Sequence, residues 1–271
     1  MKTFPRCLFL VLIFILLLAC TESPAPGKQV LVKNNTGNRI IDSYWLYLPS
    51  DYTAQRKWPI ILFLQGQGVI SSDPLTCKED GPIHYRNSPV GSLINEFVIV
   101  NPHMKIGQLE ERQWPQYSST LIEIVKNISK TYNGDSTRFY LTGLSLGGTG
   151  TWEIAKRNSN FFAAIVPISG ALNCDSDCDK LVNQNIWIIH NQKDNNISYT
   201  YPDDAVKQLE QMSGVDFLHI SSNQLPKDSA NVKHILSLTK KSGHDAWSDA
   251  YSSPHLYKWL LSKKLKSIAD P

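Results

Sequence analysis

The chain has 271 residues and carries 27 lysines and arginines against 24 aspartates and glutamates, a formal net charge of +3. This near-neutral balance provides no basic surface for nucleic acid, so we expect no nucleic-acid partner. The roughly 250 residues beyond the N-terminal segment are enough for one large domain with a substantial core.

The N-terminus has the pattern of an export signal. Lys2 and Arg6 precede an apolar run over residues 7–19, which is shorter than a comfortable membrane span. The run ends in LLAC, which resembles a bacterial lipobox, and this resemblance implies cleavage before Cys20 and a lipid on that cysteine. The alternative is an ordinary cleaved signal that has Cys20 merely nearby.

The segment after the signal is TESPAPG (residues 21–27), which is polar and rich in proline, as a flexible tether is. We therefore predict a signal peptide over 1–19, a lipidated tether over 20–27 and one folded domain over 28–271. The protein is expected to be exported to the cell envelope, with the outer membrane as the favoured location, and to contact the membrane only through the N-terminal lipid.

Three cysteines remain in the folded part, and export exposes them to an oxidising compartment. The pair in CDSDC, Cys174 and Cys178, can close on itself, or either can pair with Cys77, and the sequence does not choose. We expect one disulfide and no metal site, because two cysteines without a second pair are a weak zinc pattern. The alternating aspartates at 175, 177 and 179 favour a solvated acidic loop over a calcium site.

Predicted strands and helices alternate along the domain. The continuous apolar run at 60–64 is typical of a parallel strand buried on both faces, whereas the alternating segment near Tyr44 is typical of a half-exposed antiparallel strand. This alternation predicts a mostly parallel α/β sheet with helices on both faces and chemistry at the carboxyl ends of the strands. In chain order we expect strands near residues 30 and 44 and at 60–64, 96–102, 138–143, 161–170, 186–191, 216–220 and 234–239, and helices at 118–132, 147–157, about 203–212 and 254–263.

The stretch GLSLG, residues 143–147, lies between a predicted buried strand and a predicted helix. In that context the pattern G-x-S-x-G holds a serine in a tight turn above the sheet, and the small neighbours let strand and helix approach. The start of the helix also favours negative charge nearby. We therefore predict Ser145 as a nucleophile. The alternative is a glycine-rich turn with a capping serine.

A serine hydroxyl needs a base to become a nucleophile. Asp194 follows the strand predicted at 186–191, and His244 follows the last predicted strand, so both are expected at the same sheet edge as Ser145. The order serine, acid, histidine is that of α/β-hydrolases. His190 is a rival base but precedes the acid, which favours a role in shaping its loop. Asp245 is a rival acid but adjoins His244, and adjacent side chains usually point apart.

The oxyanion formed by attack on a carbonyl needs two donors. We expect one to be the backbone N–H of Leu146 and the other to come from the loop LQGQG, at Gln67 or its neighbours. Trp114, Trp152 and Trp247 flank predicted site loops and can stack on a sugar or an aromatic acid, or else fill the core. Trp152 is expected in the core, and Trp114 is the preferred substrate-binding residue.

Five segments carry a family resemblance that covers roughly residues 40–262. They resemble secreted esterases of the α/β-hydrolase superfamily, which include polyhydroxybutyrate depolymerase-like and feruloyl-esterase-like enzymes and are often labelled predicted peptidases or prolyl-oligopeptidase-like. The resemblance implies Ser145 as nucleophile, Asp194 as acid and His244 as base, with no cofactor. The segments are YWLYLPSDY…KWPIILFLQGQG, RFYLTGLSLGGTGTWEIA, FFAAIVPISG, IWIIHNQKD and GHDAWSDAYSSPHLYKWLL.

The resemblance implies hydrolysis of carboxylic esters, and we expect acetyl or feruloyl esters on carbohydrate and a monomeric enzyme. A serine peptidase and a non-catalytic binding lipoprotein are the alternatives.

The sequence departs from the family at three places. Gln65 replaces a histidine of the oxyanion loop and is expected to replace some of its hydrogen bonds. His190–Asn191 stands where relatives have His-Gly, and residues 221–233 form a polar insertion.

Overall fold

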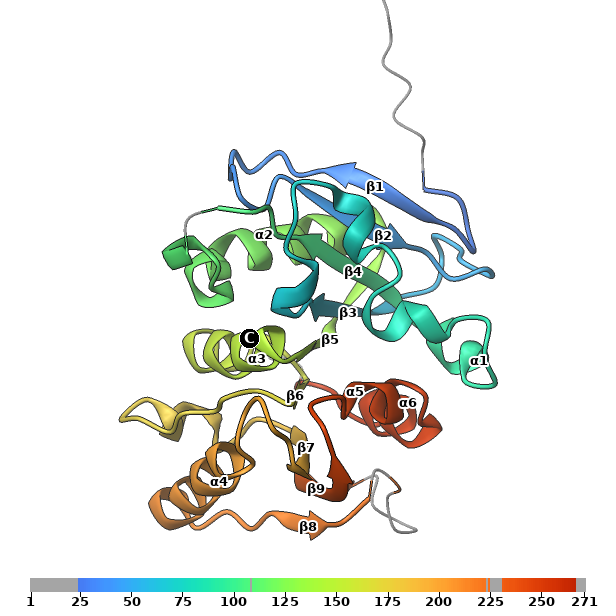
Figure 1. Ribbon diagram of the computed structural model, residues 1–271. Helices are drawn as coiled ribbons and strands as arrows, with labels where there is room; N and C mark the ends of the chain where they lie inside the picture. Colours follow the sequence, from blue (N-terminus) through green and yellow to red (C-terminus); the bar gives the residue numbers. More distant parts are fainter. Residues whose placement is uncertain (1–23, 108, 223, 225–230, 267–271) are drawn as a thin grey trace, which may run out of the picture.

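A nine-stranded sheet forms the centre of the computed structural model, which describes residues 24–266 apart from 108, 223 and 225–230 (Figure 1). The strands are β1 (Gln29–Lys33), β2 (Ser43–Tyr47), β3 (Trp58–Leu64), β4 (Val98–His103), β5 (Gly134–Leu144), β6 (Ala164–Ile168), β7 (Ile186–Lys193), β8 (Leu218–Ile220) and β9 (His234–Ser242). Their order across the sheet is β1-β2-β4-β3-β5-β6-β7-β9-β8. The pairings of β2 with β1 and β4 are antiparallel, and all the others described are parallel.

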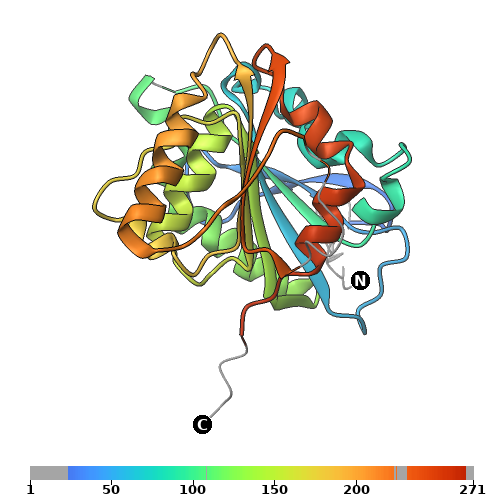
Figure 2. The same cartoon turned by 90° about the horizontal axis from the view of Figure 1, so that it is seen from below.

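Helices cover both faces of this sheet, and Figure 2 shows the two layers on either side of the strands. One face is covered by α2 (Ser118–Thr131), α3 (Leu146–Arg157) and α4 (Thr200–Ser213), and the other by α1 (Gly91–Ile94), α5 (Trp247–Tyr251) and α6 (Pro254–Leu261). Each layer encloses its own cluster of buried apolar side chains. The central strands are continuous apolar runs because both of their faces are buried, as in β3, where every residue is buried.

The predicted mostly parallel sheet with helices on both faces is confirmed, with shifts at element ends. Strand β5 is longer than expected, and α4 begins earlier because Pro202 fits in a first helical turn. The half-exposed character predicted for β2 is wrong, since all five of its residues are buried. The segment after β3 covers it: Trp45 donates its indole N–H to the Pro74 carbonyl at 2.8 Å, and Lys78 lies over the Trp45 ring.

Short helices that periodicity did not reveal fill the connection between β3 and β4. They are η1 (Gln67–Val69), η2 (Pro74–Cys77) and η3 (Gly81–Tyr85), followed by α1. Helix α5 was also not predicted. Elements of one or two turns are too short to show a helical repeat of apolar residues. These short elements nevertheless form much of the wall beside the candidate site.

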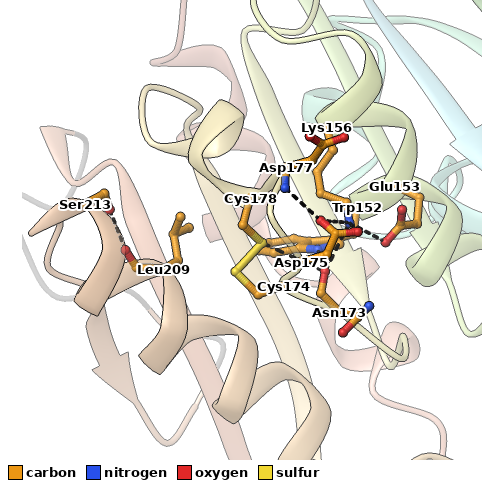
Figure 3. Close-up of a disulfide and its surroundings, with 10 residues drawn as sticks. All are labelled: Trp152, Glu153, Lys156, Asn173, Cys174, Asp175, Asp177, Cys178, Leu209 and Ser213. Atoms are coloured by element: carbon orange, nitrogen blue, oxygen red, sulfur yellow. Dashed lines mark hydrogen bonds and ion pairs between the residues drawn. A yellow bond between two sulfur atoms is a disulfide. The ribbon is translucent and has the colours of Figure 1, made fainter.

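The disulfide closes within CDSDC, between Cys174 and Cys178, and Cys77 is a buried free thiol (Figure 3). The bridged loop packs on α3, where Trp152 donates its indole N–H to the Asn173 carbonyl at 2.9 Å. Asp175 binds the buried ammonium of Lys156 at 3.1 Å, so this aspartate is engaged in an ion pair of the loop.

Several predictions lie outside the described residues. The signal peptide, Cys20 and its lipid fall within residues 1–23, and most of the 221–233 insertion is likewise not described. They stay predictions. Among residues 24–266 as described, no helix is long and apolar enough to cross a membrane. The same residues contain no group of three or more histidine, cysteine, aspartate or glutamate side chains placed to hold a metal ion.

Candidate active site

Ser145 lies between the end of β5 and the start of α3, with φ 54° and ψ −118°. Such a positive φ is strained for a residue with a side chain and is maintained here by close backbone packing. A Cβ on Gly147 would lie 2.0 Å from the Leu64 carbonyl oxygen, and one on Gly143 would lie 2.4 Å from the Gly147 carbonyl oxygen. The glycines of the motif therefore allow the strand and helix to meet beneath the serine.

The structure brings Ser145, Asp194 and His244 together, although about 100 residues separate the first from the last. His244 Nε2 lies 2.8 Å from Ser145 Oγ, and His244 Nδ1 lies 2.7 Å from Asp194 Oδ2. With the proton on Nδ1 donated to the carboxylate, Nε2 can accept the serine proton. This is the arrangement in which an imidazole acts as a general base toward a hydroxyl.

Asp194 is a buried carboxylate with several donors. Its Oδ1 accepts the backbone N–H groups of Asn196 at 2.8 Å and Ile197 at 3.1 Å, while Oδ2 faces His244. Burial raises the pKa of Asp194, but the hydrogen bonds from His244 and from these two N–H groups outweigh it and hold the pKa below its ordinary value. Asp194 is therefore ionised at neutral pH and can stabilise a charged imidazole on His244.

His190 and Asp245, the rivals considered from the sequence, have other contacts. His190 is fully buried, and its Nε2 lies 2.9 Å from the Ile197 carbonyl oxygen and 3.2 Å from Asp194 Oδ2. Burial lowers the pKa of His190, so the ring is neutral with the proton on Nε2. His190 thus shapes the loop of the acid. Asp245 caps the turn before α5 by accepting the Ser248 N–H at 2.8 Å.

Two residues that sequence reasoning missed hold the His244 loop. The buried Asn191 side chain donates to the carbonyls of Gly243 at 3.0 Å and Asp245 at 3.1 Å, on either side of His244. Ser169 Oγ donates to the carbonyl of His244 itself at 2.8 Å. The departure from His-Gly at 190–191 was the available signal, because an asparagine at a strand end has an amide that can bridge to a neighbouring loop.

The loop after β3 lies against the nucleophile. A Cβ on Gly66 would lie 3.6 Å from Ser145 Cβ, and both Gly66 and Gln67 line the same cleft as Ser145. Leu146 is the first residue of α3, so its N–H has no partner within the helix. These positions suit the two predicted donors, Leu146 and Gln67, which remain assignments that we propose below.

Trp114 is not placed as predicted. Its side chain is fully buried, it is not among the residues that line the cleft, and its Nε1 donates to the Gln65 carbonyl at 3.0 Å. It packs on α3, where a Cβ on Gly150 would lie 2.5 Å from Trp114 Cβ. The substrate-binding expectation for Trp114 is therefore corrected: the indole supports the loop from beneath. Trp152 is in the core, as expected.

Gln65 also differs from expectation. The residue is fully buried, yet neither polar atom of its side chain has a hydrogen-bond partner among the described residues. The amide therefore does not replace the hydrogen bonds of a histidine at this position. The loop is instead held through its backbone: the Trp114 indole donates to the Gln65 carbonyl, and Thr76 Oγ1 donates to the Val69 carbonyl at 2.9 Å.

The cleft above Ser145 has a volume of about 650 Å³. Its lining includes Ser145, His244 and Leu144, together with Gly66–Val69, Asp80, Asn196 and Trp247. Trp247 meets the His244 ring edge to face, with ring centroids 5.3 Å apart. Trp247, rather than Trp114, is thus the tryptophan placed to contact a bound molecule.

Solved structures share this architecture. A thermostable esterase aligns with a TM-score of 0.68 at 22% identity over 88% of this chain, which spans 63% of that esterase. The fold is that of the α/β-hydrolases. A feruloyl esterase module from Clostridium thermocellum aligns with a TM-score of 0.63 at 14% identity, covering 89% of this chain and 90% of the module. An acetyl xylan esterase from Aspergillus awamori aligns with a TM-score of 0.60 at 14% identity, covering 86% of this chain and 100% of that esterase.

No protein-family model matches the sequence, and no curated protein matches it. At the identities found, the structural likeness establishes the fold, and function has to be argued from the site.

Proposed function

We propose that the protein is a serine hydrolase that cleaves carboxylic esters through an acyl-enzyme. The observation that carries this proposal is the continuous hydrogen-bonded chain from Ser145 Oγ through the His244 ring to the buried carboxylate of Asp194. A serine that lines a cleft from a strained turn, with an oriented imidazole beside it, is the arrangement that acyl transfer needs.

In the proposed reaction Ser145 Oγ attacks the ester carbonyl carbon while His244 Nε2 takes the serine proton. The tetrahedral intermediate collapses, the carbon–oxygen bond to the alcohol breaks, and His244 returns the proton to the leaving alkoxide. Water then attacks the acyl-enzyme with His244 again as base, which releases the acid and restores Ser145. Asp194 keeps the imidazole oriented and stabilises its charged form.

We assign the oxyanion to the backbone N–H groups of Leu146 and Gln67. Leu146 supplies the first N–H of α3, and Gln67 lies in the loop that faces Ser145 across the cleft. Preorganised donors of this kind are each worth about 3 kcal/mol of transition-state stabilisation. Apart from the substrate and water, these steps need no cofactor.

The substrate class is inferred from the cleft and from the structural neighbours. The cleft is open and combines apolar side chains such as Leu144 and Val69 with a tryptophan. Two of the structures similar to this chain are described as feruloyl and acetyl xylan esterases. We therefore favour acetyl or feruloyl esters of carbohydrate over peptides.

The first test is Ser145→Ala, assayed on p-nitrophenyl acetate and with a fluorophosphonate probe. We expect kcat to fall about 10⁴-fold or more and labelling to disappear, because the attacking oxygen is removed. Ser136 is an exposed serine at the other end of β5, and Ser136→Ala is the matched control. This variant should keep both the wild-type kcat and the labelling by the probe. A folded wild-type protein that fails to label would favour a binding protein on a hydrolase scaffold.

The same assay separates esterase from peptidase. Initial rates on acetyl and feruloyl esters are compared with rates on short peptide anilides at equal concentration. Faster cleavage of the anilides, lost in Ser145→Ala, would replace the ester assignment by a peptidase and leave the nucleophile assignment intact.

A further inference from the structure

A smaller hollow of about 190 Å³, lined by residues of η3 and α5, adjoins the cleft above Ser145. Asp80 and Trp247 line both spaces, so they form the junction between them. The smaller hollow has room for about six water molecules, which is the scale of one small polar group. A substrate whose ester carbonyl lies at Ser145 can therefore extend past Asp80 into this hollow.

Asp80 has few partners within the protein. Among the described residues its side chain accepts one hydrogen bond, from the Gly81 N–H at 3.1 Å, and forms no ion pair. Burial raises the pKa of Asp80 to about 6, although the Gly81 N–H and the nearby His84 act in the opposite direction. At neutral pH this carboxylate is thus ionised, partly removed from water and short of donors, and a ligand that brings donors would stabilise it.

The charge of the two spaces limits which ligand fits. None of the residues that line the cleft or the hollow is a lysine or an arginine, and the hollow adds a second carboxylate, Glu79, which pairs with Arg86. An anionic group would be repelled by the Asp80 carboxylate, because neither of the described linings supplies a lysine or an arginine and Arg86 is already paired with Glu79. A neutral group with donors and a cation both satisfy this constraint.

The other polar groups of the hollow favour the neutral ligand. Its lining includes the hydroxyls of Tyr85 and Ser248 and the imidazole of His84. Tyr85 and His84 can both donate and accept hydrogen bonds, and Ser248 Oγ, which donates to Asp245 Oδ2 at 2.7 Å, can still accept one. This mixture suits hydroxyls, whereas a cation uses acceptors alone. The partly exposed indole of Trp247 adds an apolar surface against which a ring can pack.

We propose that Asp80 binds hydroxyl groups on a sugar ring in the alcohol part of the ester, with Trp247 packed against that ring. Two hydroxyls on neighbouring carbons can donate to the two carboxylate oxygens. Asp80 then determines specificity, favouring esters of neutral sugars over simple alkyl esters and rejecting anionic alcohols. This inference rests on the proposed esterase activity and goes beyond it by naming the residue that selects the alcohol.

The test is Asp80→Asn, assayed on three esters of one acid: a methyl xyloside ester, the ethyl ester and the choline ester. The acid is acetic or ferulic, whichever gives the faster p-nitrophenyl ester hydrolysis. We expect the ratio of kcat/KM for the xyloside ester to that for the ethyl ester to fall about tenfold, because hydrogen bonds to a charged group are weakened. Asparagine can still accept the Gly81 N–H, so the turn is kept.

Asp73→Asn is the matched control, since Asp73 lies on the same segment, caps η2 and lies outside both linings. It should keep the wild-type ratio. An unchanged ratio in Asp80→Asn, or a larger loss on the choline ester than on the xyloside ester, overturns the sugar assignment. A protein that labels at Ser145 and cleaves the ethyl ester without preferring the xyloside overturns this inference alone. Absent labelling overturns the proposed function and this inference with it.

Thermal stability against pH provides a second readout. Because the pKa of Asp80 is raised in the folded state, the unfolded chain loses this proton first, and the wild type loses stability as pH rises from about 4 to about 7. Glu79, His84, Tyr85, Cys77 and Tyr251 are the titratable groups around Asp80, and Arg86 is the cation paired with Glu79. All of them are retained in Asp80→Asn, so the difference in melting temperature reports on Asp80. We expect the melting temperature of Asp80→Asn, relative to that of the wild type, to rise by a few degrees as the pH increases across this window. If Asp80→Asn were no more stable than the wild type above this pH window, groups of the protein itself would already compensate the Asp80 carboxylate. That result would contradict the proposal.

Discussion

The turn that carries Ser145 and the loop that follows β3 lie against each other at the same cleft, but different contacts hold them. The Ser145 turn is held by backbone atoms: Gly143, Gly147 and Gly148 each approach a carbonyl oxygen so closely that a Cβ would lie within 2.4 Å of it. The loop at 65–69 has an open position at Gly68, and its Gln65 amide has no partner among the described residues. Side chains hold this loop, with the Trp114 indole donating to the Gln65 carbonyl and Thr76 Oγ1 to the Val69 carbonyl.

Because of this difference, the two sides of the site tolerate side-chain substitution to different extents. The contacts that hold the Ser145 turn are made by backbone atoms, so they do not depend on exchangeable side chains. The fold itself therefore fixes the position of the nucleophile. The oxyanion loop depends on side chains, which can be exchanged while the sheet stays intact. Variation in geometry among such sites is therefore expected in the loop rather than in the nucleophile turn.

The largest effect is expected from a methyl group added to the turn. In Gly147→Ala the new Cβ would lie 2.0 Å from the Leu64 carbonyl oxygen, so either strand or helix must shift. We expect the free energy of unfolding to fall by about 3 kcal/mol or more, measured by urea denaturation.

The control for that change is Gly68→Ala, where nothing lies within 4 Å of the added Cβ. Its unfolding free energy should stay within about 0.5 kcal/mol of the wild type. Equal destabilisation by the two substitutions would show that the turn and the loop do not differ in the way described.

An intermediate effect is expected when the indole donor beneath the loop is removed. Trp114→Phe keeps one aromatic ring, leaves a small cavity and leaves the Gln65 carbonyl without its 3.0 Å hydrogen bond. We expect about 1–3 kcal/mol of lost stability. In addition, kcat on p-nitrophenyl acetate should fall about tenfold with little change in KM, because a displaced oxyanion donor acts on the transition state.

Trp152→Phe separates the two consequences. Trp152 is equally buried and donates its indole N–H to the Asn173 carbonyl at 2.9 Å, away from the loop (Figure 3). This variant should lose comparable stability and keep kcat. If kcat fell equally in both variants, the Trp114 indole would have no specific role in positioning the loop.

Much of this site could be predicted from the sequence because it depends on local patterns. A buried strand followed by G-x-S-x-G places Ser145, and the ends of later strands place Asp194 and His244 at the same edge. The loop contacts could not be predicted, because they join residues distant in sequence. Nothing in ERQWPQY indicates that Trp114 turns toward the Gln65 carbonyl rather than toward the cleft.

The contacts of Asn191 and Asp80 show the same limit. The Asn191 amide reaches carbonyls more than 50 residues further along the chain, and no periodicity encodes that pairing. Asp80 lies in a connection of one-turn helices, where apolar spacing has no signal. Its place beside Ser145 follows only from how η3 packs against α5.

The smallest effect, and the only gain in stability in this series, is expected at Gln65. Neither polar atom of its buried side chain has a partner in the part of the chain that the structure describes, so Gln65→Met exchanges an unsatisfied amide for an apolar chain of similar length. We expect the unfolding free energy to rise by about 1 kcal/mol, since burying an unpaired amide is unfavourable. Gln184→Met is the control, because the buried Gln184 donates to the Phe162 carbonyl at 2.9 Å and should lose stability by about the same amount. If both variants lost stability, the Gln65 amide would have a bound partner such as an internal water, and the loop would be held by more than the contacts of Trp114 and Thr76.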